Sequence, residues 1–361
     1  MKAALLTGVS FAGYNIGSGF ATGIEATQFF ASWGPVHGFM GIGLAAILAI
    51  ITLLVIYNAG YEEHFPDSKS VYSYFFGRKL GAFFDIYVYV SLLLMALAMI
   101  SGAGATINQY SGIPTIVGAS IMGAVSIVVS MTGINRLKNI LSYITFFIVG
   151  SIICSAIYIF VTTDITVTQG AANVDQYVDD GLMLHAAFLG LKSWYFSSLA
   201  SVGLLITAGF AWASVTGSLC QSRKEAMLTG IFSSVIFYST FIVVTYMLLV
   251  STDFVAGQEV PLLGVIQHFM PPLAIVYSGI IIIAIFATVT GRLFSIAERY
   301  GRGKKPVEFA IVLVITVVAI VGTKFISFSL LSNFLFLFCG ATGVVMGLLL
   351  IGSYIRRKLA K

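Results

Sequence analysis

Long apolar segments recur along the whole chain, separated by short polar stretches. A helix needs roughly 20 apolar residues to cross a bilayer, and ten segments approach or exceed that length. The pattern therefore predicts ten spanning helices, approximately over Ala3–Ala31, Val36–Tyr61, Leu80–Asn108, Ile113–Met131, Leu137–Val161, Ser193–Leu219, Ala226–Val250, Leu273–Ala297, Val307–Gly322 and Phe328–Ile355.

The composition excludes a soluble globular domain. Hydrophobic residues make up 58% of the sequence and charged residues 9%, which is typical of a polytopic membrane protein. No linker or change in composition marks a second domain, so we expect one all-α transmembrane domain over residues 1–361. The three cysteines lack the spacing of metal ligands or of a disulfide framework.

The Lys and Arg residues predict the orientation of the chain. Loops on the cytoplasmic side carry an excess of these residues. With a cytoplasmic N-terminus, all basic residues but Lys192 and Lys324 lie inside. We therefore expect a multi-pass protein of the cell membrane with both termini in the cytoplasm. This topology accounts for the net charge of +5, which gives no reason to expect nucleic acid as a partner.

Two predicted external loops are long. The first holds an apolar stretch that predicts an interfacial helix within about residues 173–191. The second reads EVPLLGVIQHFMPP, where Pro261 suits the first turn of a short helix and Pro271 and Pro272 end it. This helix is expected to cover the outer face.

Ten spans with an inside N-terminus divide into two groups of five that enter the membrane from opposite sides. That arithmetic is typical of an inverted repeat, with repeat one over about residues 3–161 and repeat two over about 193–355. The first and sixth spans then correspond, and both contain interior glycines.

The first span contains the stretch GYNIGSGFATGIEATQFF, Gly13–Phe30. Glycines at this depth indicate either close helix packing, because small-xxx-small spacing is present, or a break in the helix. In the second interpretation, Ile16 to Gly19 unwinds near the midplane. Its carbonyl groups then coordinate a cation, and the N-terminus of a half-helix attracts an anion.

The run GSGFATGIEATQFFASWG, Gly17–Gly34, resembles the first-helix signature of the YkvI-like family of bacterial membrane proteins, G-[AS]-G-F-A-[ST]-G-Q-E followed by Q-F-F and Gly. That family belongs to the amino-acid/polyamine/organocation superfamily. The resemblance implies a LeuT-type fold with a five-plus-five inverted repeat, in which helices one and six are discontinuous. Ile24 departs from the family, where Gln is expected, and this departure puts a shared substrate in doubt.

The resemblance also implies a candidate site for a coupling ion. Sodium-coupled members of the superfamily use two carbonyl groups before the first-helix break, at positions matched by Gly13 and Ile16. They also use hydroxyls of helix eight, where Ala284 and Thr288 fall on the matching pattern but Ala287 supplies no hydroxyl. A second sodium site would need Asn where this chain has Phe20. Sodium and protons both remain open as the coupling ion, and no other cofactor or metal is expected.

Glu25 is the main ionisable residue in the outer half of the membrane. A carboxylate at the centre of a spanning helix costs about 2.5 to 3.5 kcal/mol on insertion scales, so it should be paired, protonated or facing water. One interpretation is a structural hydrogen bond to another helix. The other is a gate, or a role in handling protons or substrate, at roughly 9 Å outward from Gly19 along a continuous helix.

The expected substrate site lies at the two breaks. Ala200 to Gly203 is the matching position in the sixth span, and Met99 belongs to a wall of small and apolar residues in the third. The residues expected to contact substrate are Gly17, Ser18, Gly19, Phe20, Ala200, Ser201, Gly203 and Met99.

These observations predict a secondary active transporter that moves a small amino acid or related zwitterion by alternating access. Spans 1, 2, 6 and 7 would rock against spans 3, 4, 8 and 9. The alternative is a ligand-sensing membrane subunit of the same fold that does not transport. No phosphate loop, catalytic triad or metal-binding His spacing is present, so we expect no enzyme.

Overall fold

The computed structural model describes residues 1–65, 68–132, 135–186, 191–301 and 304–360. Helices make up almost all of them. The α-helices are α1 (Lys2–Asn15), α2 (Ser18–Ala21), α3 (Ile24–Phe29), α4 (Gly34–Glu63), α5 (Ser68–Ser111), α6 (Thr115–Thr132), α7 (Asn135–Thr162), α8 (Val167–Gly170), α9 (Val174–Asp179), α10 (Trp194–Gly217), α11 (Arg223–Val250), α12 (Thr252–Val255), α13 (Pro261–Phe269), α14 (Ala274–Gly301), α15 (Lys305–Gly322) and α16 (Phe328–Leu359). Two short 3₁₀ helices, η1 (Ala31–Trp33) and η2 (Pro271–Leu273), complete them.

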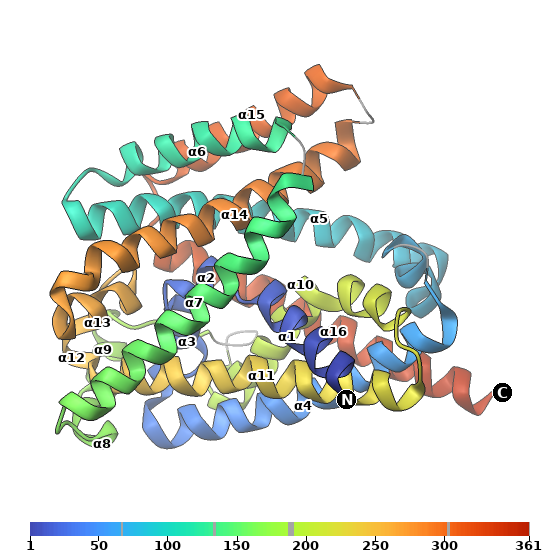
Figure 1. Ribbon diagram of the computed structural model, residues 1–361, viewed down its shortest axis with the longest axis horizontal. Helices are drawn as coiled ribbons and strands as arrows, with labels where there is room; N and C mark the ends of the chain where they lie inside the picture. Colours follow the sequence, from blue (N-terminus) through green and yellow to red (C-terminus); the bar gives the residue numbers. More distant parts are fainter. Residues whose placement is uncertain (66–67, 133–134, 187–190, 302–303, 361) are drawn as a thin grey trace.

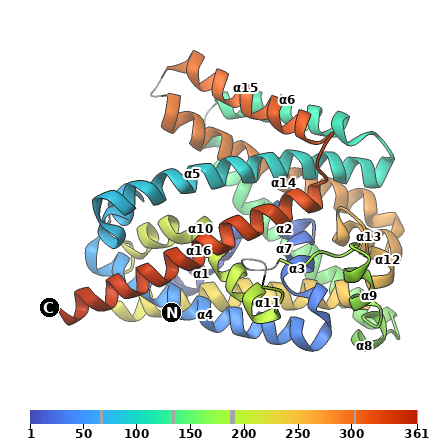
Figure 2. The same ribbon diagram turned by 180° about the vertical axis from the view of Figure 1, so that it is seen from behind.

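The long helices form two packed groups (Figure 1). In one group α4 packs against α10 and α11, and α1 lies on α11. In the other, α5 packs against α6, α14 and α15. Helix α7 crosses one face of the molecule, and α16 runs along the opposite face, where it packs on both α10 and α5 (Figure 2).

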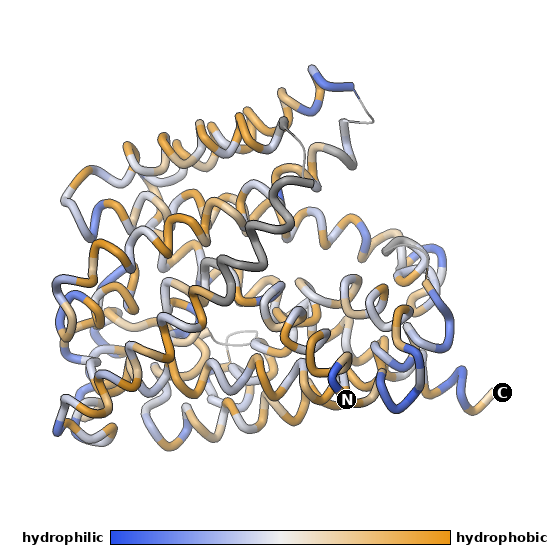
Figure 3. The backbone as a smooth tube through the Cα atoms, viewed as in Figure 1, coloured by the Kyte–Doolittle hydropathy of each residue, from blue (hydrophilic) through white to orange (hydrophobic). Residues whose placement is uncertain are grey.

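Seven helices of the described residues are long and apolar enough to cross a membrane, or eight if the bent pair over 147–162 and 167–179 counts as one span. Apolar residues run along the lengths of the helices, and polar residues gather at the two ends of the molecule (Figure 3). The chain is thus an all-helical, multi-pass membrane protein. The predicted fourth span is shorter, with an apolar stretch over Thr115–Ser130.

The predicted first span is divided into several pieces. Helix α1 ends at Asn15, and neither Ile16 nor Gly17 belongs to a helix. After the single turn of α2, Gly23 takes a φ of +82°, in the left-handed region where glycine avoids the steric cost that other residues meet. The backbone therefore leaves the helical path twice between Asn15 and Ile24.

The predicted break in the sixth span is wrong. Helix α10 runs from Trp194 to Gly217 without interruption. The glycine in that region has a packing role, because a Cβ on Gly203 would collide with the carbonyl oxygen of Gly340 in α16. A helix with neither Pro nor Asn at this point keeps its backbone hydrogen bonds, as hydrocarbon surroundings demand.

Both long loops carry helices. The predicted cap is confirmed as α13, with Pro261 in its first turn and η2 directly after it. The external helix expected within 173–191 is shorter, because α9 ends at Asp179 and Gly181 turns the chain with a φ of +73°. Residues 187–190 of that prediction lie outside the described part of the chain.

Candidate functional site

The break after α1 leaves a side-chain oxygen and a main-chain carbonyl without hydrogen-bond partners among the described residues. Asn15 donates from Nδ2 to the Phe11 carbonyl at 2.9 Å, while its Oδ1 is buried with no hydrogen-bond partner in the described structure. The Gly17 amide bonds to the Asn15 carbonyl at 2.9 Å. Among the described residues, no backbone amide donates to the Ile16 carbonyl. An open carbonyl at membrane depth is costly unless a ligand or water satisfies it.

Helix α14 lies against this break. A Cβ on Gly17 would stand 3.7 Å from Oγ1 of Thr288, so the glycine lets the two elements approach closely. The Thr288 hydroxyl donates to the Ala284 carbonyl at 2.8 Å, one turn earlier, which directs its lone pairs away from its own helix. The structure therefore brings Ile16 and Thr288 to the same junction, while Gly13 lies in the last turn of α1.

Glu25 turns back toward the break. It lies in the first turn of α3, and its Oε2 is 3.3 Å from the position of a Cβ on Gly19. The turn at Gly23 causes this approach, since a continuous helix would hold the two residues apart. Phe336 of α16 lies on the same side of Gly19, at 3.9 Å from that Cβ position.

Arg292 adds a cation to the same region. It follows Thr288 by four residues in α14, which places both on one face about 6 Å apart along the axis. Its Nη1 is buried without a hydrogen-bond partner among the described residues. The guanidinium interacts electrostatically with Tyr14, Cys339 and Glu25, although no ion pair within 4.0 Å joins it to Glu25 in the described part of the chain.

Two other predicted substrate residues, Ser18 and Phe20, follow the break directly in α2, and a third, Met99, lies in α5. Phe20 is fully buried, and its ring meets that of Phe241 edge-on at 5.1 Å between centroids. Met99 is buried in α5. Ser18 begins α2, and its side chain lies outside the described part of the molecule.

The predicted contribution of the sixth span lies elsewhere. Ala200 and Gly203 face Gly340 of α16, and the Ser201 hydroxyl pairs with Tyr238 of α11 at 3.3 Å. The residue of α10 that meets the break is Gly209. A Cβ there would stand 3.1 Å from Nδ2 of Asn15.

Helix α13 packs against the second break of the first span. The Leu262 amide donates to the Thr22 carbonyl at 3.0 Å. A Cβ on Gly23 would lie 2.9 Å from Cγ of Leu262. The turn at Gly23 therefore gives α13 the room to approach the broken span.

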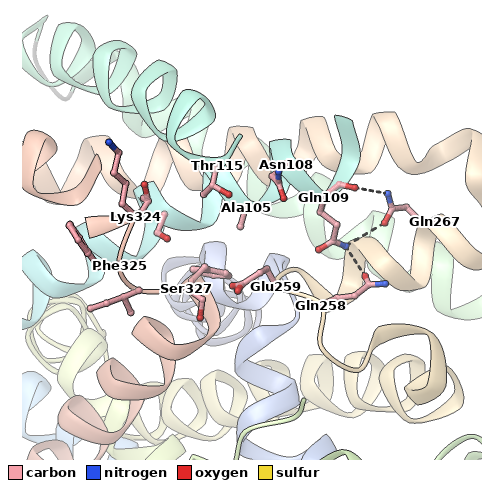
Figure 4. Close-up of a pocket in the computed structure, with 14 residues that line it drawn as sticks. Ala105, Asn108, Gln109, Thr115, Gln258, Glu259, Gln267, Lys324, Phe325 and Ser327 are labelled. Carbon is pink, nitrogen blue, oxygen red and sulfur yellow. Dashed lines mark hydrogen bonds between the residues drawn. The ribbon is translucent and has the colours of Figure 1, made fainter. Parts of the chain in front are cut away.

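A polar cavity of about 630 Å³ opens between α5, α13 and the α15–α16 connection. Figure 4 shows an amide cluster at one side, where Nε2 of Gln109 donates to Oε1 of Gln258 at 2.8 Å and to Oε1 of Gln267 at 3.4 Å. At the other side Glu259 lies beside Ser327. Its Oε2 accepts from the Ser329 amide at 2.7 Å, at the N-terminus of α16. Burial raises the pKa of Glu259, and the hydrogen bonds from α16 oppose that shift.

The loop before α10 closes over α3. His185 stacks on Trp33 with 3.7 Å between ring centroids, and its Nδ1 lies 3.0 Å from Oγ of Ser32. Asn333 of α16 donates to Oε1 of Gln28 at 3.0 Å and to the His185 carbonyl at 2.9 Å. Together with α13, this network ties the outer end of the broken span to α16.

A second cavity, of about 280 Å³, lies between α1, α10 and α11. It includes Ser10, Trp212 and Glu225. Trp212 also stacks on Tyr14, with 5.5 Å between ring centroids. This cavity therefore lies beside the middle of α1 and reaches the ring pair of Trp212 and Tyr14.

The sequence pattern did not single out Asn15 or Arg292 as site residues. Two signals could have identified them. Asn15 is an amide directly before the Ile16–Gly17 pair, and Arg292 stands inside the apolar window that runs to Ala297. An intramembrane cation is a functional candidate by default.

The chain is similar in sequence to two proteins of Bacillus subtilis (strain 168). It is 23% identical to the membrane protein YkvI over 297 residues, covering 80% of this chain and 78% of YkvI. It is 23% identical to the protein YyaD over 321 residues, covering 89% and 88%. No protein-family model matches the chain. The resemblance seen in Gly17–Gly34 is confirmed, since the chain is homologous to YkvI and YyaD.

Solved structures give the fold. The chain matches a Na⁺-coupled sialic acid symporter with a TM-score of 0.55 at 14% identity, covering 89% of this chain and 72% of the symporter. It matches the Eremococcus coleocola manganese transporter with 0.54 at 16%, covering 96% and 76%. Mhp1, a nucleobase-cation-symport-1 family transporter, gives 0.50 at 13%, covering 95% and 71%. These structural neighbours are transporters of the LeuT fold.

Proposed function

We propose that this homologue of YkvI and YyaD is a secondary active transporter that carries a small amino acid or related zwitterion by alternating access. The observation that carries the proposal is the break at Ile16 and Gly17, where the Ile16 carbonyl has no backbone amide partner among the described residues and Gly17 lies against Thr288. A solute that replaces the missing hydrogen bonds is bound by the broken segment itself.

The grouping of helices supports alternating access. Helices α1, α4, α10 and α11 correspond to spans 1, 2, 6 and 7, and α5, α6, α14 and α15 to spans 3, 4, 8 and 9. Each set packs mainly within itself, and the broken segment lies between α11 and α14. We infer ten spans related by a five-plus-five inverted repeat, with both termini in the cytoplasm. Neighbours of this fold that are symporters agree with this arrangement.

The coupling ion is sodium or a proton. Sodium is favoured by the junction of the Ile16 carbonyl with the Thr288 hydroxyl, with Gly13 and Ala284 supplying further carbonyl groups. A proton is favoured by Glu25, whose carboxylate faces the break at Gly19. Both groups border the same space, so the coupling ion and the substrate are expected to be neighbours.

The alternative is a ligand-sensing subunit that binds the same class of molecule without moving it. The hydrogen bonds that α13, His185 and Asn333 make around the broken span favour this alternative, because they hold the span in one arrangement. The grouping of the long helices into two sets that each pack mainly within themselves favours a carrier, because rocking motion needs two such bodies.

Counterflow in proteoliposomes separates the two functions. Vesicles holding purified protein are loaded with an unlabelled neutral amino acid and diluted into the same labelled amino acid, with and without sodium and at two pH values. A carrier accumulates label transiently inside the vesicles. Binding of label without any exchange across the membrane would rule out transport and leave the sensor.

A further inference from the structure

Two opposite charges face the broken segment from different helices. The Glu25 carboxylate comes from α3 and lies against Gly19. The Arg292 guanidinium comes from α14, one turn beyond the Thr288 side chain that meets Gly17. Because Gly17 and Gly19 have no side chain, neither position adds side-chain atoms between these groups.

No ion pair within 4.0 Å joins the two charged side chains among the described residues. Each belongs to its own element. Glu25 lies in α3, which follows the Gly23 turn against Leu262, and Arg292 lies in α14, on the same face as Thr288 and packed on α5. A ligand that carries both signs can therefore pair with each of them separately.

Unsatisfied hydrogen-bonding groups lie on both sides of the break. Nη1 of Arg292 is a buried donor without a partner, and Oδ1 of Asn15 is a buried acceptor without one, in the part of the chain that the structure describes. A buried charged donor that makes no hydrogen bond destabilises the folded protein. The anionic group of a ligand would accept a hydrogen bond from this nitrogen and balance the charge of the guanidinium.

We propose that Arg292 binds the carboxylate and Glu25 the ammonium group of a zwitterionic α-amino acid, which lies across Gly17 and Gly19. An α-amino acid carries its two charges on one carbon, so it can enter between two fixed protein charges of opposite sign. Arginine presents a planar fork of donors that matches a carboxylate. Phe336 of α16, beside Gly19, gives the side chain an apolar wall.

This assignment rests on the proposed transport function but is tested by binding alone. The probes are L-alanine, L-valine and L-leucine, together with the amines that lack their carboxylate (ethylamine, isobutylamine and isoamylamine) and the acids that lack their ammonium (propionate, isovalerate and 4-methylpentanoate). Binding to purified full-length protein is measured by calorimetry and by the ligand-induced rise in thermal stability.

Removing one charge should change the preferred class of probe. Arg292→Gln should weaken amino-acid binding by about tenfold or more and leave the amines unaffected. Glu25→Gln should weaken amino-acid binding to a similar degree and leave the acids unaffected. This crossover separates charge recognition from a structural defect, because misfolding weakens all probes together.

Arg292→Lys and Glu25→Asp keep each sign and should keep the zwitterion preference, even where the neutral variants fold poorly. Arg357→Gln and Glu62→Gln are the matched controls. Arg357 bonds to the Tyr74 carbonyl and Glu62 pairs with Lys358, both away from the break, so neither variant should alter binding.

Failure of the assignment and failure of transport give different results. Amino-acid affinities that Arg292→Gln and Glu25→Gln leave unchanged, with counterflow intact, would overturn the assignment only. Binding with the expected crossover but without counterflow would overturn transport only. Wild-type protein that binds none of the three amino acids would also overturn the assignment.

Discussion

Gly203 of α10 and Gly340 of α16 approach so closely that neither position has room for a Cβ. A Cβ on Gly203 would collide with the Gly340 carbonyl oxygen, and a Cβ on Gly340 would lie 2.8 Å from the Ala200 carbonyl oxygen. Small residues at both positions let two long helices pack backbone to backbone in the membrane.

Gly203→Ala is therefore expected to destabilise the protein. Overpacking of this kind costs about 1 to 3 kcal/mol, and both backbones here are rigid helices. Thermal unfolding of the purified variant measures the loss. Gly352→Ala is the matched control in α16, because no atom lies within 4 Å of its Cβ position. Equal melting temperatures for Gly203→Ala and wild type would refute the close packing.

Gly23→Ala should impair the protein more than Gly181→Ala. Both glycines have positive φ, of +82° and +73°, which costs another residue about 1 to 2 kcal/mol. Only Gly23 also lies against Leu262, whereas no atom lies within 4 Å of the Cβ position of Gly181. Substrate-dependent counterflow and the melting temperature of each variant test the difference. Equal counterflow and equal melting temperatures of the two variants would show that the close contact between Gly23 and Leu262 is not required.

Thr288→Val should raise the half-saturating sodium concentration for uptake by about tenfold or more, because it removes a hydroxyl oxygen that lies beside the break at Gly17 while keeping the side-chain shape. Thr290→Val is the control. Its hydroxyl is buried two residues further along α14 and points away from that face. Uptake with unaltered sodium dependence in Thr288→Val would exclude this hydroxyl from ion binding.

Glu25→Gln should abolish the pH dependence of uptake while the protein still folds. The charged or titratable groups that act on Glu25 are Arg292 of α14 and Tyr238 of α11, and Tyr14 of α1 acts in turn on Arg292. Ordinary Arg and Tyr side chains titrate well above pH 8, which leaves Glu25 as the group that changes charge. Uptake is compared at several pH values, and a pH profile identical to that of the wild type would rule out this role.

Protein stability should fall as the pH drops from about 6.5 toward 4, because of His185. Burial lowers the pKa of His185 to about 4, with Lys192 adding to the shift and Asp175 and Asp179 opposing it. The unfolded chain, with an ordinary pKa near 6.5, binds the proton first on acidification. The stabilisation is complete above pH 6.5 and is lost as the pH approaches the folded value.

His185→Phe keeps the stacking on Trp33 and removes the titration. The melting temperature of this variant should depend less on pH in that interval. Because the imidazole is partly exposed, the pH-dependent part of the free energy of unfolding that His185 contributes should be about 1 kcal/mol or less. A wild-type melting temperature that stays constant between pH 7 and pH 5 would contradict the buried neutral imidazole.

The apolar segments of the sequence predicted a multi-pass helical protein, because hydrocarbon requires long stretches without charge whatever their packing partners. Local signals were equally direct for Pro261 and for the glycines around Ile16, since proline and glycine act through their own backbones. The resemblance over Gly17–Gly34 indicated the fold, which the relatives and structural neighbours bear out.

What a glycine is for could be decided only by the tertiary structure. Gly203 and Gly17 are both glycines inside predicted spans. Gly203 meets the backbone of α16 inside a continuous helix, whereas Gly17 lies in a break beside Thr288. Likewise, the turn at Gly23 and the register of α14 bring Glu25 and Arg292, 267 positions apart, to the same space. Such encounters depend on contacts between distant helices, which no local pattern records.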